Sequence, residues 1–81
     1  MSNRSEADSL KITKIEKHAG SGMWHGTAAA GTNQYLWYFR PRSWLRMQEQ
    51  DKISPRCWMT VEPPDGARQI VLKAIRTAKA A

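Results

Sequence analysis

The chain has 81 residues, 41% of them hydrophobic, and a formal net charge of +6 at pH 7. This length accommodates one domain with a small core, and no window of about 18 apolar residues exists, so we expect no membrane-spanning segment and no membrane partner. A basic excess draws a protein towards nucleic acid, anionic membranes or acidic partners, and it carries no information about the fold.

The N-terminal part of the chain is predicted to form a tail and a β-hairpin. Residues 1–9 have no bulky apolar side chain after the initiator Met, so we expect a disordered tail, with residues 10–81 as the single globular domain. Within residues 10–17, the first two apolar side chains alternate as in a strand, whereas the second and third fit helical spacing. The β-branched residues and the following Gly-Ser-Gly cluster favour a strand, a turn and a weaker second strand over residues 23–30.

The middle of the chain carries most of the aromatic residues. A strand is predicted most strongly over residues 34–39, because aromatic side chains favour strands, and we expect its aromatic residues to build the core. Pro41 lacks a backbone donor and fixes φ, so the strand should break there and residues 40–46 should turn away. Ser43 is expected to cap a short helix over residues 44–51.

The C-terminal part is predicted to form a strand and a helix. Residues 57–62 alternate in hydrophobicity, with Trp58 and Thr60 on one face of the expected strand. A Pro-Pro-Asp-Gly sequence breaks this strand, and Asp65 is a suitable N-cap for a helix. After it, apolar side chains fill one arc of a helical wheel and cations fill the opposite arc, which predicts an amphipathic C-terminal helix.

These elements predict an α+β fold with the order β-β-β-(short α)-β-α. About four antiparallel strands would form a small sheet, and the amphipathic helix would cover one of its faces. The other face would be open to water or to a partner. The expected core consists of Ile12, Ile15, Met23, Trp24, Leu36, Trp37, Phe39, Leu45, Trp58, Val61, Ile70, Val71, Ala74 and Ile75.

A small OB barrel of the cold-shock variety is the alternative fold. The turn-rich first hairpin and the aromatic third strand look similar to that family, with Gly22-Met-Trp-His-Gly26 and Leu36-Trp-Tyr-Phe39 in the places of its aromatic strands. Those motifs are not reproduced, and a helix stands where the barrel ends in a strand. The outline of a sheet with a C-terminal helix is also similar to double-stranded-RNA-binding domains, but their leading helix and basic helix-start motif are absent. Neither resemblance assigns a role to any residue.

Catalytic and metal signatures are missing from the sequence. His18 and His25 are too far apart for a helical metal pair, and the single cysteine cannot complete a structural zinc site. Because Cys57 is the only cysteine, no intrachain disulfide can form, which fits a reducing compartment, and we expect a cytoplasmic protein. We expect the Cys57 thiol to pack as a small hydrophobic group. We expect no enzymatic activity, no metal and no cofactor.

Nucleic acid is the partner that the basic residues favour. Arg40, Arg42 and Arg46 alternate with the aromatic Trp44, and such a pattern suits a surface that binds phosphates and stacks on bases, in DNA or RNA. The alternative is that the aromatic side chains belong to the core and the arginines form a solvated rim. A second basic group lies on the predicted helix and joins this surface only if the fold brings it to the same side; its members are Arg68, Lys73, Arg76 and Lys79.

A protein-interaction role is the rival hypothesis. The chain would then be a small accessory protein of the phage, plasmid or integron type, whose aromatic sheet face binds another protein or its own copy as a homodimer. Trp, Tyr and Arg are enriched at the centres of protein interfaces, so the same aromatic and basic stretch supports this reading.

Overall fold

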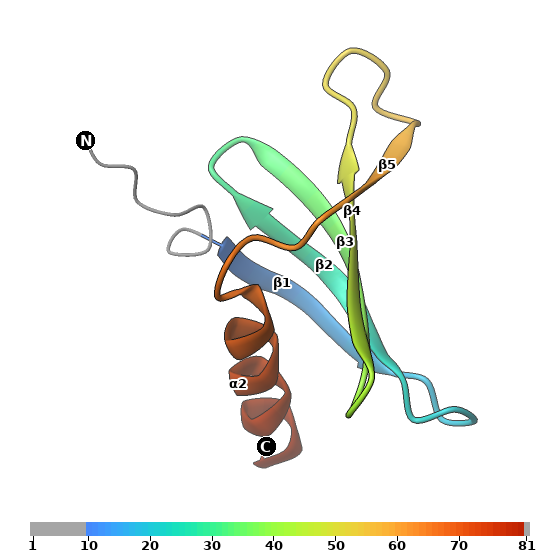
Figure 1. The fold of residues 1–81 in the computed structure, drawn as a ribbon, viewed down its shortest axis with the longest axis vertical. Helices are drawn as coiled ribbons and strands as arrows, with labels where there is room; N and C mark the ends of the chain where they lie inside the picture. Colours follow the sequence, from blue (N-terminus) through green and yellow to red (C-terminus); the bar gives the residue numbers. More distant parts are fainter. Residues whose placement is uncertain (1–9, 81) are drawn as a thin grey trace.

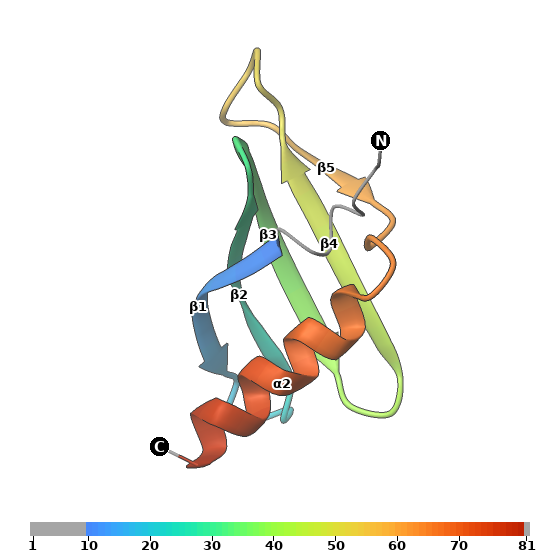
Figure 2. The ribbon, with the colours of Figure 1, turned by 90° about the vertical axis from the view of Figure 1, so that its left-hand side faces the viewer.

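The computed structural model describes residues 10–80, which form a five-stranded antiparallel sheet and a C-terminal helix (Figure 1). The strands follow one another across the sheet in chain order: β1 (Leu10–Lys17), β2 (Trp24–Ala30), β3 (Asn33–Arg40), β4 (Trp44–Gln50) and β5 (Trp58–Val61). Helix α2 (Ala67–Ala80) runs diagonally across one face of the sheet (Figure 2). The predicted tail lies outside the described residues, and no helix within residues 10–80 is long and apolar enough to cross a membrane.

The predicted α+β fold is confirmed. The sheet is open rather than closed into a barrel, because each strand pairs only with its neighbours in the sequence and β1 does not pair with β5. The strands predicted over residues 10–17, 23–30, 34–39 and 57–62 correspond to β1, β2, β3 and β5, and the C-terminal helix is also present. The chain therefore forms a two-layer arrangement of one sheet and one helix.

The segment predicted as a short helix over residues 44–51 is instead strand β4, so this prediction is wrong. The turn before it is tight: Arg42 adopts a positive φ of 66°, and the amide of Ser43 donates to the carbonyl of Arg40 at 3.0 Å. This closure brings the following segment beside β3, whose backbone groups along that edge then find partners. Tertiary pairing thus overrides the modest helix propensity of the Glu and Gln residues in β4.

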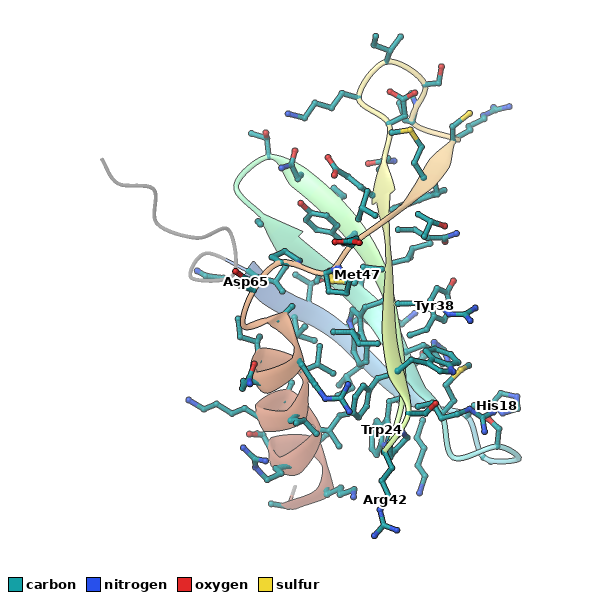
Figure 3. All side chains as sticks on the ribbon, viewed as in Figure 1. His18, Trp24, Tyr38, Arg42, Met47 and Asp65 are labelled. Carbon is teal, nitrogen blue, oxygen red and sulfur yellow. The ribbon has the colours of Figure 1, made fainter. Side chains whose placement is uncertain are left out.

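The core lies between α2 and one face of the sheet, and β3 supplies its largest side chains. Tyr35, Trp37 and Phe39 alternate along β3 and are buried on this face, in one cluster with Val71 and Ile75 of α2. Figure 3 shows Met47 of β4 pointing towards the helix side as well. The complete buried set is Leu10, Trp24, Ala28, Ala30, Tyr35, Trp37, Phe39, Met47, Ala67, Val71 and Ile75.

Most of the expected core residues belong to this cluster. Ile12, Ile15, Leu45, Val61 and Ile70 are partly buried and pack against it, and Ala74 is also partly buried. The expectation is wrong for Leu36 and Trp58, whose side chains lie half-buried on the opposite face of the sheet. Successive side chains of a strand point to opposite faces, so the neighbours of core residues cannot share the core.

Two other expectations about packing are also wrong. Met23 is only partly buried and precedes β2 rather than contributing to the buried set. Cys57 is exposed, because it lies in the loop between β4 and β5 rather than in either strand.

A bulge in β1 explains why position 26 is a glycine. The register of β1 against β2 shifts between Ile12 and Lys14, and the backbone of β1 passes very close to Gly26 at this point. A Cβ atom on Gly26 would overlap the carbonyl oxygen of Lys14. Only glycine fits here without a shift of β1, since the obstructing atoms belong to the backbone.

Trp37→Ala is expected to lower the free energy of unfolding by about 3–5 kcal/mol. The Trp37 side chain is 0% exposed, and its indole nitrogen donates to the carbonyl of Thr27 at 3.1 Å, so the variant loses both packing and a hydrogen bond. The matched control Trp58→Ala removes a half-buried ring and should cost no more than about 1–2 kcal/mol. Denaturant unfolding measures both values, and equal costs would contradict the placement of Trp58 outside the core.

Gly26→Ala should destabilise the domain by about 1–3 kcal/mol or more, since β1 must move to accommodate the new methyl group. Gly20→Ala is the control, because a Cβ atom there meets only the His18 side chain at an ordinary contact distance of 3.5 Å. Thermal unfolding compares the two variants. A melting temperature of Gly26→Ala equal to that of the parent would show that the bulge does not constrain this position.

Candidate nucleic-acid interface

Within residues 10–80, no helix lies on the sheet face opposite α2, which is called the open face below. Figure 3 shows Tyr38 pointing away from the helix, opposite to Met47. The strand registers place further side chains on the same side as Tyr38, because residues paired across a sheet share a face. The open face includes Lys11, Lys14, Glu16, His25, Thr27, Ala29, Gln34, Leu36, Tyr38, Arg40, Trp44, Arg46, Gln48, Gln50, Trp58 and Thr60.

Trp44 and Arg46 form a stacked pair on this face. They are two residues apart in β4, so their side chains point the same way. The guanidinium carbon of Arg46 lies 4.5 Å from the centroid of the Trp44 ring, within the range of a cation–π interaction. Trp44 is half-buried, whereas Arg46 is exposed. The indole of Trp44 therefore positions the guanidinium group of Arg46, and the N–H donors of this group stay accessible to a ligand.

A hollow of about 410 Å³ adjoins this pair. Its walls combine rings with polar groups, and the lining residues are Met23, Tyr38, Trp44, Arg46, Met47, Gln48 and Thr60. Within the described part of the chain, the side chains of Gln48 and Thr60 make no hydrogen bond to another protein group. The hollow thus offers a surface for stacking together with an amide and a hydroxyl that can bind a polar ligand.

Positive charge dominates the open face. Lys11, Lys14, Arg40 and Arg46 share it with a single acid, Glu16. The Glu16 carboxylate lies 3.4 Å from the Nζ atom of Lys14, and both side chains are more than half exposed. This acid therefore offsets one neighbouring cation at the β1 edge, and the arginines of β3 and β4 keep their charge for a ligand.

Tyr38 is supported by a second ring from β2. The centroids of His25 and Tyr38 are 6.4 Å apart with an angle of 29° between the ring planes. The Nε2 atom of His25 also lies 3.9 Å from a carboxylate oxygen of Glu16. These contacts run across three strands in one register row, which holds Tyr38 beside Arg46 in β4.

The structure brings together part of the predicted site. Arg40 lies opposite Trp44 in the register of β3 and β4, so both join Arg46 on the open face. Arg42 lies in the turn that connects these strands, at the same end of the sheet. Figure 3 shows Arg42 at the tip of this turn, beyond the strands themselves.

The helix cations are not part of this group. Lys73, Arg76 and Lys79 are exposed on α2, which covers the opposite side of the sheet (Figure 2). Arg68 also belongs to α2, and its guanidinium carbon lies 5.3 Å from the ring centroid of Phe39, where it covers an edge of the core. The sheet therefore separates the two basic groups that the sequence suggested as one surface.

Several open-face residues were missed by the sequence interpretation. Tyr38 was included in an aromatic run assigned to the core, and Gln48 was assigned to a helix. The strict alternation of β3 is the signal that could have found Tyr38, since its two aromatic neighbours, Trp37 and Phe39, are the buried ones.

Among residues 10–80, no three His, Cys, Asp or Glu side chains gather closely enough to hold a metal ion. No protein-family model, curated protein or solved structure matches this chain. The interpretation of the open face therefore depends on its own geometry and charge.

Proposed function

We propose that this protein binds nucleic acid through its open face and catalyses no reaction on it. The observation that carries this proposal is the stacked Trp44–Arg46 pair beside Tyr38, on a sheet face that no helix of the described chain covers. A guanidinium group forms paired hydrogen bonds with phosphate, and a neighbouring aromatic ring can stack on a base. The excess of cations on the same face favours a polyanion over an acidic small molecule.

The placement of the side chains also supports a binding role over a purely structural one. The ring of Trp44 lies outside the buried cluster, so the core does not account for it. Rings that border an accessible hollow keep one side free for a ligand. Strands hold such groups more rigidly than loops do, so less freedom is lost when a ligand binds.

The cations of α2 serve this function at long range. They are separated from the open face by the sheet, so they do not contact the phosphates that Arg46 contacts. They still contribute to the net charge of +6, which accelerates the approach of a polyanion at low ionic strength.

Removal of two open-face arginines should weaken nucleic-acid binding more than removal of two helix cations. The test compares Arg40→Ala/Arg46→Ala with Arg76→Ala/Lys79→Ala, because each double variant lowers the net charge of +6 by two. Fluorescence anisotropy of labelled oligonucleotides over a range of salt concentrations measures the affinities. The open-face variant should lose about 10-fold or more in affinity and about 1.4 units or more of salt slope, with the helix variant much closer to the parent.

Equal losses in the two double variants would show that net charge, rather than the open face, determines binding. No binding by the parent at low salt would contradict the proposed function itself. Circular dichroism of both variants confirms that the substituted, exposed side chains leave the fold intact.

Protein–protein association is a second candidate, favoured by the β5 edge. This strand has four residues, and in the described part of the chain it pairs only with β4. Met59 of β5 is 51% exposed, and Ile53 in the preceding loop is 91% exposed. An exposed strand edge with apolar side chains can pair with another chain.

Sedimentation analysis at low and high salt tests this second candidate. Association through the β5 edge should persist at high salt, since apolar contacts and backbone hydrogen bonds are not screened as charges are. Met59→Lys should abolish it, whereas Thr60→Lys, on the open face of the same strand, should not. A monomer under both conditions would eliminate the candidate.

A further inference from the structure

We infer that the open face binds a single strand of nucleic acid, with one unpaired base seated in the hollow against Tyr38 and Trp44. This inference rests on the proposed function and specifies the form of its ligand. Three observations carry it: the position of the rings within the sheet, the lining of the hollow and the distribution of the neighbouring cations.

Tyr38 lies too far inside the sheet to read a duplex. In its register row, His25 of β2 lies on one side and Arg46 of β4 on the other, with β1 beyond β2. Trp44 lies nearer the β3–β4 turn, beyond the last residue pair of β4 with β5. Four strands at a spacing of about 4.8 Å make a surface about 14 Å wide at Tyr38, whereas the major groove of B-DNA is about 12 Å wide. A two-stranded ribbon enters that groove, but a face of this width does not, so duplex bases stay out of reach of Tyr38.

An unpaired base, in contrast, can reach the rings of both Tyr38 and Trp44. Bases within a duplex stack on one another, so their flat faces are covered, whereas a single strand can turn a base outward onto an aromatic side chain. Tyr38 and Trp44 are diagonal neighbours across β3 and β4, a relation that places the two residues about 7–8 Å apart. Since both rings border the hollow, a base that enters it meets aromatic carbon from both strands.

The size and the polar lining of the hollow suit one nucleoside. Its volume of about 410 Å³ lies near the lower end of the range for small-molecule sites, which is about 300–1,000 Å³. The side chains of Gln48 and Thr60 line it and make no hydrogen bond to another protein group within residues 10–80. An amide and a hydroxyl each offer a donor and an acceptor, so both can bind the edge of a base.

Cations border this site on the side of the β3–β4 turn. Arg46 is stacked on Trp44 and lines the hollow, and Arg40 lies across from Trp44 in the register. A base in the hollow would thus place its own phosphate close to two guanidinium groups. Cationic groups and aromatic rings thus lie next to each other, as binding of a flexible polyanionic strand requires.

Competition binding tests the form of the ligand. A fluorescent single-stranded oligonucleotide is bound to the protein and displaced by unlabelled single-stranded DNA, single-stranded RNA, duplex DNA of the same sequence, and a DNA strand that contains abasic sites throughout. We expect either intact single strand to compete about 10-fold or more better than the duplex at equal phosphate concentration. The abasic strand should compete no better than the duplex, since it has phosphates without bases.

Variants of the aromatic residues test the seat of the base. Trp44→Leu should weaken binding of the intact single strand by about 10-fold or more, while binding of the abasic strand stays within about 3-fold of the parent. Trp44→Phe keeps a ring and should restore most of the affinity, which separates stacking from any loss of folding. Trp58→Leu is the matched control, because Trp58 lies on the open face but does not line the hollow.

The outcomes separate this inference from the function on which it rests. Binding of nucleic acid with equal affinity for duplex and single strand, unaffected by Trp44→Leu, would overturn the single-strand inference and leave the proposed function standing. Equal losses in Trp44→Leu and Trp58→Leu would overturn the hollow as the base site. No binding of any oligonucleotide at low salt would overturn both proposals.

Discussion

The buried apolar cluster between the sheet and α2 holds this domain together. Tyr35, Trp37 and Phe39 of β3 are its rings from one strand, and Val71 and Ile75 of the helix belong to the same cluster. These rings bury more apolar surface than the many alanines of the chain can, so a domain of this size depends on them. The burial of these three rings on one face also determines which β3 side chains lie on the opposite face, because the residues between them must point the other way.

The open face exists because α2 buries only one face of the sheet. With a single helix in the described chain, only one side of the sheet is covered, and Tyr38, Trp44 and Trp58 remain outside the buried cluster. Half-buried rings on an uncovered face stabilise a fold less than core rings do, and under the proposed function they bind the ligand. The stacked Arg46 adds charge at the same place, which gives the face a chemistry suited to nucleic acid.

The sheet also divides the charge of the protein. Arg40 and Arg46 lie on one side, and Lys73, Arg76 and Lys79 lie on the helix that covers the other. Under the proposed function, a ligand on the open face would contact the first group and would experience the second only as part of the overall electrostatic field. Basic residues of one chain therefore do not have to share one site, since the sheet can separate residues of the same charge.

Local signals in the sequence determined the turns, strands β1, β2, β3 and β5, and the C-terminal helix, because glycine, proline and hydrophobic periodicity act over a few residues. They also identified Arg40, Trp44 and Arg46 as a group, since these residues are close in the chain. Strand β4 was decided by tertiary structure: its hydrogen bonds come from β3 and β5, and its Glu and Gln residues favour a helix locally. The side of the sheet that Tyr38 and Trp58 face was decided in the same way, because α2 selects the face that becomes the core only when the whole sheet is assembled.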